Sequence, residues 1–112
     1  MALKHAQPGE VVHLHALDAS PEGSKSSAIV KRDRFEAARL VVPVGSTIPT
    51  HRVPGYFTLQ CLEGRVVLEA GREIELGAGD WVFLDRDDPH AVRAVEDSLL
   101  LLTILFDDRP GD

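Results

Sequence analysis

The sequence predicts an all-β domain, and three observations support that prediction. Its apolar residues come in short runs rich in Val, Leu and Ile. Nine glycines and seven prolines are spread along the chain and separate these runs. No segment of about ten residues or more repeats its apolar positions at helical spacing. A chain of 112 residues with this pattern is expected to form one domain, a sandwich or barrel of short strands.

Each expected strand is a β-prone run that ends near a turn residue. About eight strands are expected, drawn from the segments 11–15, 28–30, 35–44, 56–62, 65–70, 72–76, 81–84, 91–95 and 99–106. The two runs on either side of Gly71 form a hairpin, and 99–106 is apolar on both faces, as a central strand is. We expect a barrel core over residues 10–106 with a flexible loop at 19–27, followed by a polar tail at 107–112.

The charge and cysteine content exclude several classes of function. Acidic side chains outnumber basic ones by 18 to 12, which gives a net charge of −6 with histidine neutral. Such a chain lacks the positive field that attracts a phosphate backbone, so no nucleic-acid partner is expected. The longest apolar run, 99–106, is far too short to cross a bilayer, so no membrane role is expected either. The single cysteine, Cys61, cannot form an internal disulfide, and we expect a cytoplasmic protein.

Two histidines are the first candidate functional residues. Five residues separate Gly45 from His51, and ten separate Gly79 from His90. Each histidine is expected at the start of a strand, behind a constrained loop. We expect the two imidazoles to meet inside the closed shell of strands, where they would face a central pocket.

The spacing around these histidines resembles the two sequence motifs of the cupins. The first motif is matched by Gly45, His51, Phe57 and Gly64, and the second by Gly79 and His90. The resemblance extends over nearly the whole chain and is closest to the small single-domain bacterial cupins. It implies a jelly-roll β-barrel, also called a double-stranded β-helix, with a central pocket and usually a dimeric assembly.

The same resemblance implies a metal site that this chain supplies only in part. In metal-binding cupins the first motif gives two histidines and a glutamate, and the second motif gives one histidine. His51 and His90 match the first and the last of these four ligands. Val53 stands in place of the second histidine and Phe57 in place of the glutamate. Neither replacement can bind a metal, so the resemblance implies an incomplete set of metal ligands.

Two imidazoles alone make a weak site, because a tightly held divalent ion takes three or four protein ligands. Cys61 is a candidate third ligand for zinc if its side chain points inward, and otherwise it is a small buried hydrophobe. One expectation is therefore a single Zn, Fe, Mn or Ni ion, and the other is no metal. With Val53 and Phe57 at ligand positions, we expect a less polar pocket than in metal-binding cupins. Either a small apolar molecule or the side chains of the protein itself would fill that pocket. The expected pocket residues are His51, Val53, Tyr56, Phe57, Leu59, Cys61 and His90.

Two further polar groups each allow two interpretations. His13 and His15 would share one face of a strand and hold a metal, or they are solvated imidazoles. The acidic residues at 85–88 form a solvated turn whose carboxylates bond local amides, or they orient His90 as a general base. The glutamates of the hairpin are expected on its solvent-facing side; they are Glu69, Glu73 and Glu75.

Two functions from different classes remain open. The first is a barrel that binds a small molecule near His51 and His90. The alternative is a metal-dependent enzyme of the oxygenase or isomerase type that uses His51, His90 and one further ligand, or a metal-free isomerase with one histidine as its acid–base group. We also expect a homodimer, because the segments 11–14 and 99–106 offer more apolar surface than a small barrel needs.

Overall fold

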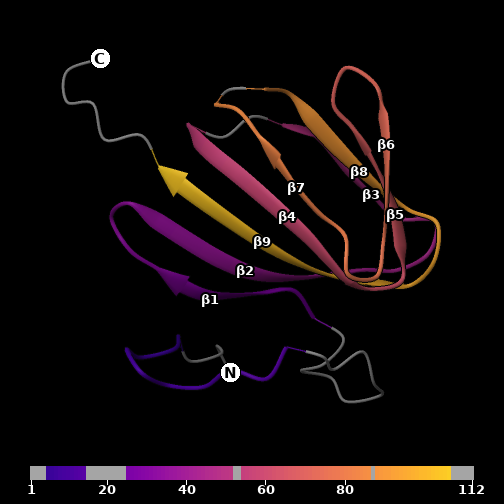
Figure 1. Cartoon of the computed structure of the whole chain (residues 1–112). Helices are drawn as coiled ribbons and strands as arrows, with labels where there is room; N and C mark the ends of the chain where they lie inside the picture. The colour runs from indigo at the N-terminus through magenta and orange to yellow at the C-terminus, as the bar shows by residue number, and fades with distance from the viewer. Residues whose placement is uncertain (1–4, 15–24, 52–53, 87, 107–112) are drawn as a thin grey trace.

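A computed structural model of the chain describes residues 5–14, 25–51, 54–86 and 88–106. Within these residues the secondary structure consists of nine strands and no helix, which confirms the all-β prediction (Figure 1). The strands are β1 (Ser27–Lys31), β2 (Phe35–Val42), β3 (Thr47–His51), β4 (Gly55–Glu63), β5 (Arg65–Glu69), β6 (Glu73–Gly77), β7 (Trp81–Leu84), β8 (His90–Ala94) and β9 (Ser98–Phe106).

The described strands form two antiparallel sheets that lie face to face as two layers (Figure 1). One sheet has five strands in the order β1-β2-β9-β4-β7, and the other has four in the order β3-β8-β5-β6. β9 lies between β2 and β4, which confirms the prediction that the run 99–106 is a central strand. β5 and β6 pair as the expected hairpin, with Gly71 between them at a φ of 77°.

The hydrophobic core lies between the two sheets and is made by alternate residues of each strand. In β4 the side chains of Phe57, Leu59 and Cys61 point into the core, whereas Tyr56 points out of it. The sequence alone does not show which residues of β4 face the core, because Pro54 and Gly55 interrupt the alternation just before the strand. The structure shows that the odd-numbered residues 57, 59 and 61 do. The cluster of buried residues is Val42, Phe57, Leu59, Cys61, Val66, Leu68, Leu76, Leu84, Val92, Ala94, Leu100 and Ile104.

Hydrogen bonds between the sheets close one end of the sandwich. The Ser98 hydroxyl, at the start of β9, is fully buried. It accepts a hydrogen bond from the Arg65 amide at 3.0 Å and donates one to the Glu96 carbonyl at 2.7 Å. Gly64 turns the chain there at a φ of 88°, where a Cβ atom would collide with the Asp97 carbonyl. Glycine is therefore required at this turn.

The prediction of a strand at 11–15 is wrong for residues 11–14, which are irregular, and His15 lies outside the described residues. A β-prone sequence forms a strand only when it finds a hydrogen-bonding partner. Residues 11–14 belong to no described ladder, and the backbone hydrogen bond to β1 comes from further upstream, from the Ala6 amide to the Ile29 carbonyl. The residues Pro8 and Gly9, in a turn, precede this segment. Most of the expected loop at 19–27 and the whole tail at 107–112 lie outside the described residues, while Ser27 already belongs to β1.

β3 is a strand that the sequence analysis misses. It contains Pro49, which has no amide hydrogen to donate to a ladder, and its register with β8 shifts between Ile48 and His51. Proline is tolerated because β3 is an edge strand of its sheet. Consequently His51 ends a strand, contrary to the expectation that it starts one, whereas His90 does begin β8.

Candidate functional site

His90 is a buried polar side chain in the apolar interior, with 1% of its surface exposed. Pro89 precedes it, and its imidazole Nδ1 lies 3.0 Å from the carbonyl oxygen of Asp88. Because a carbonyl oxygen can only accept, Nδ1 carries the proton and donates this hydrogen bond. In the neutral ring Nε2 is then the nitrogen with the lone pair. The backbone beside β8 thus sets both the orientation and the tautomer of the ring.

Phe57 is the aromatic neighbour of His90 across the core. The two ring centroids are 4.2 Å apart and the ring planes are inclined by 41°. This contact joins β4 of the five-stranded sheet to β8 of the four-stranded sheet. Phe57 occupies the position that the family resemblance assigns to a glutamate ligand, and its ring lies directly against the one remaining histidine of the second motif. A carboxylate ligand is thus replaced by an apolar surface.

The strand register brings His51 and His90 together at the level of the backbone. They are directly opposite partners in the antiparallel pair of β3 and β8. Directly opposite positions of such a pair are about 4.5–5.5 Å apart at Cα. The sequence thus predicts that these two backbone positions are neighbours, although they are 39 residues apart in the chain. Val53 lies outside the described residues.

Leu59 and Cys61 lie on the same inner face of β4 but further from His90. Cys61 lies four positions along the strand from Phe57, which corresponds to ~13 Å. The Cys61 Sγ donates to the Glu63 carbonyl at 3.4 Å. Burial raises the pKa of this thiol above its ordinary value, and the Asp80 carboxylate raises it further. The protonated thiol therefore packs as a small hydrophobe and is remote from the histidines.

Tyr56 lies on the opposite face of β4 from the core. It is exposed on the outer surface of the five-stranded sheet. Its ring is 6.0 Å from the Phe83 ring, and the guanidinium carbon of Arg86 is 5.7 Å from its centroid. Among the expected pocket residues whose side chains the structure describes, Tyr56 faces away from the interior.

The acidic residues between β7 and β8 bond mainly to their own backbone. An Asp88 carboxylate oxygen accepts from the Asp85 amide at 3.2 Å, and an Asp85 carboxylate oxygen accepts from the Arg86 amide at 2.8 Å. This is the local turn chemistry that the sequence allows. The group that orients His90 is the carbonyl of Asp88, which no side-chain pattern reveals. Asp87 lies outside the described residues.

The described residues do not fit the metal centre that the resemblance implies. Among them, no group of three or more His, Cys, Asp or Glu side chains converges on a point. The Phe57 ring, which lies against His90, has no donor atom. A divalent ion held firmly by protein needs three or four such donors.

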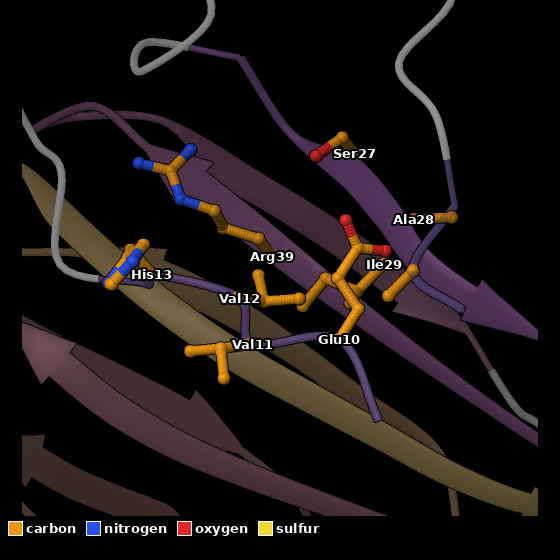
Figure 2. Close-up of a pocket in the computed structure, with 9 residues that line it drawn as sticks. Glu10, Val11, Val12, His13, Ser27, Ala28, Ile29 and Arg39 are labelled. Carbon is orange, nitrogen blue, oxygen red and sulfur yellow. The ribbon is translucent and has the colours of Figure 1, made fainter. Parts of the chain in front are cut away.

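A hollow that the sequence analysis misses lies on the outside of the sandwich (Figure 2). It has a volume of about 390 Å³ and lies between the N-terminal segment and the strands β1 and β2. Its lining residues are Ala6, Glu10, Val11, Val12, His13, Ser27, Ala28, Ile29 and Arg39. Arg39 is buried there, and it donates to the carbonyls of Leu14 and Lys25, both at 3.3 Å. Its guanidinium therefore anchors the N-terminal segment to β2.

The sequence and the fold identify the family of this chain. The family model of the cupin domain matches residues 38–106, which include most of the described strands. The chain therefore belongs to the cupins, and its two facing antiparallel sheets form the jelly roll that the resemblance implies. A search of curated proteins finds no match.

Several solved structures share this fold at low sequence identity. A cupin superfamily protein from Desulfitobacterium hafniense is 20% identical with a TM-score of 0.79, covering 96% of this chain and 100% of that one. A conserved protein of unknown function from Streptococcus pyogenes is 18% identical with a TM-score of 0.76, covering 96% of each chain. A protein from Thermus thermophilus is 24% identical with a TM-score of 0.69, covering 88% of this chain and 99% of that one. These likenesses establish the fold. In the part of the chain described, no helix is long and apolar enough to cross a membrane.

Proposed function

We propose that this cupin binds a small molecule inside the sandwich, at the end where His51 and His90 are register partners. The observation that carries the proposal is the buried His90 imidazole, which the Asp88 carbonyl holds in one tautomer. A polar ring in an apolar core costs stability unless its hydrogen bonds are made. A binding site needs a few polar groups in fixed positions, and the buried His90 imidazole, held in one orientation, is such a group.

The ligand that suits this surrounding is small, largely apolar or aromatic, with one hydrogen-bond donor. The His90 imidazole would be the polar group that such a ligand meets. Phe57 would supply an aromatic face, and Leu84, its register partner on β7, an aliphatic one. Phenols and indoles have this combination of a flat apolar body and a single O–H or N–H group.

A metal-dependent enzyme is the second candidate, and the register of His51 with His90 is the observation that favours it. It ranks lower because neither Phe57 nor the distant Cys61 completes the ligand set. Elemental analysis of untagged protein separates the two candidates. Less than about 0.1 equivalent of any transition metal supports the binding module, and about one equivalent of Zn, Fe, Mn or Ni would favour the enzyme.

The binding proposal is tested with phenol, indole and benzoate in NMR titrations that observe the His90 and Phe57 ring signals. We expect saturable shifts of both rings with phenol or indole. His90→Asn keeps a donor near the Nδ1 position and removes Nε2. It should therefore weaken binding about tenfold, the value of one hydrogen bond.

The matched control is His13→Asn, which makes the same substitution at an exposed histidine. It should leave the affinity unchanged. If no probe shifts the two rings, or if all shifts map to the hollow around Arg39, the proposed site is wrong.

A further inference from the structure

The segment between β7 and β8 links the outside of one sheet to the buried histidine of the other. It leaves the end of β7 in the five-stranded sheet and reaches His90 at the start of β8 in the four-stranded sheet (Figure 1). Its residues 85, 86, 88 and 89 are described. Asp88 supplies the carbonyl oxygen that lies 3.0 Å from His90 Nδ1. Whatever holds Asp88 in position therefore also orients the imidazole.

Hydrogen bonds within the segment give it the shape of a turn. The Asp85 amide donates to an Asp88 carboxylate oxygen at 3.2 Å, and the Asp88 amide donates to the Asp85 carbonyl at 3.4 Å. The Arg86 amide donates to an Asp85 carboxylate oxygen at 2.8 Å. These bonds are exposed to water, where a hydrogen bond adds little net stability. They join the turn to itself, so they do not attach it to the sandwich.

Arg86 brings this turn into contact with the outer face of the five-stranded sheet. Its guanidinium carbon lies over the Tyr56 ring, 5.7 Å from the ring centroid. A cation within about 6 Å of the centroid is attracted to the face of an aromatic ring. The Tyr56 ring in turn lies 6.0 Å from the ring of Phe83, on β7. The half-buried Arg86 side chain therefore rests on a ring that is itself packed against a neighbouring strand.

Two adjacent residues of β4 thus contact the two ends of the same segment from opposite faces of the sheet. Tyr56 points outward and meets Arg86, whereas Phe57 points inward and meets His90 with 4.2 Å between the ring centroids. Successive side chains of a strand always point to opposite faces. The segment therefore spans the edge of the five-stranded sheet, with a contact outside that sheet and a contact inside it.

We propose that Arg86 is a positioning residue for His90 and that Tyr56 is its anchor. The contact between them keeps the turn in place, and the turn keeps the Asp88 carbonyl on Nδ1. When the turn is displaced, the ring loses this acceptor, and the bond that sets its tautomer is gone. A cation–ring contact near the surface favours the held position of the turn by about two- to fivefold. That this orientation serves a ligand rests on the function proposed above.

The experiment measures how fast the His90 Nδ1 proton exchanges with solvent, by NMR of the full chain at one fixed pH. This rate rises with the fraction of molecules in which the hydrogen bond to Asp88 is broken. Tyr56→Leu removes the ring and keeps an apolar side chain, and it should speed the exchange about two- to fivefold. Tyr56→Phe keeps the ring face and should exchange this proton at the wild-type rate.

A second variant and two controls show whether the contact itself is responsible. Arg86→Gln should speed the exchange as much as Tyr56→Leu does. The double variant should exchange no faster than either single variant, because both changes remove one contact. Trp81→Leu is the matched control, since it replaces a ring of the same face that is 60% exposed, and it should change nothing. The Leu100 amide, in the central strand β9, reports global unfolding and should keep its exchange rate.

An unchanged exchange rate in Tyr56→Leu would overturn the proposal. Equal acceleration in Trp81→Leu, or additive effects in the double variant, would overturn it as well. Parallel acceleration at Leu100 would also do so, because the change would then be global and not at the turn. Failure of the proposed binding function has a different signature. Phenol and indole would then leave the wild-type rings unshifted, while the His90 proton would still respond to Tyr56→Leu.

Discussion

The outer faces of the two sheets differ in the side chains that they expose to solvent. On the four-stranded sheet Arg65 lies 3.1 Å from Glu75, and Arg93 lies 3.6 Å from Glu69 and 3.5 Å from Glu73. The three glutamates are exposed and the two arginines are partly exposed, which confirms the sequence prediction of a solvent-facing side for the hairpin glutamates. On the five-stranded sheet the outward-facing positions that are paired across the described strands β9, β4 and β7 are uncharged. Large aromatic side chains are exposed there where the other sheet has ion pairs.

The difference teaches that the alternation of inward and outward residues does not by itself reveal how an outer face is used. Both sheets contribute an apolar inner face to one core. The outer face of the hairpin carries paired charges, whereas the outer face of β4, β7 and β9 carries exposed rings and a leucine: Tyr56, Trp81, Phe83 and Leu105. The role of each outer face therefore has to be inferred from its own charges and rings.

The largest effect is expected from two neighbouring residues of β4 that point to opposite faces. Phe57→Ala should lower the free energy of unfolding by about 3–5 kcal/mol, because it empties part of the core beside His90. Tyr56→Ala, on the outer face, should cost less than about 1 kcal/mol in the monomer. Urea unfolding at low chain concentration measures both losses. Equal losses would contradict the assignment of inner and outer faces.

An intermediate effect is expected at the boundary between the covered and uncovered parts of the five-stranded sheet. Arg39→Ala should cost about 2 kcal/mol, because the hydrogen bonds from its guanidinium to the Leu14 and Lys25 carbonyls are lost. Arg39→Lys should recover little, since one ammonium group cannot reproduce the guanidinium fork. Urea unfolding measures the loss, and faster hydrogen exchange of the Ala6 amide reports release of the N-terminal segment. Arg72→Ala, at an exposed turn, is the control and should change neither quantity.

The smallest effect is expected on the outer face of the four-stranded sheet. Arg93→Ala removes its exposed contacts with Glu69 and Glu73 and should cost no more than about 0.5 kcal/mol. The difference from wild type should vanish at about 1 M salt, where the screening length is short. Urea unfolding at low and high salt tests this. A loss that exceeds that of Arg39→Ala, or one that salt leaves unchanged, would mean that this face is more than a solvated surface.

Much of the fold follows from the sequence because strand signals are local. Short apolar runs between glycines and prolines give eight of the nine described strands, and the run at 99–106 identifies the central one. The two errors come from pairing, which is not local. Residues 11–14 have the composition of a strand but pair with no described strand. β3 pairs with β8 although it contains Pro49.

The candidate site is predictable only where a family motif marks it. The motif spacing points to His51 and His90, which the register then places opposite each other. The sequence does not reveal that the Asp88 carbonyl orients His90, because any residue supplies a carbonyl. Nor does the sequence reveal that five large apolar side chains share one outer face, because they come from four strands that only the topology brings together. They are Phe35, Tyr56, Trp81, Phe83 and Leu105.

The buried hydroxyl of Ser98 has a consequence for how molecules enter the interior. It ties β5 to β9 at the end where Gly64 turns, and the Cys61 amide and carbonyl bond residues 79–80 at the same end. Because these hydrogen bonds hold one end, we expect the two layers to separate first at the opposite end, where β3 ends and β8 begins. A small molecule that binds at the imidazole of position 90, as proposed above, would then enter from that end.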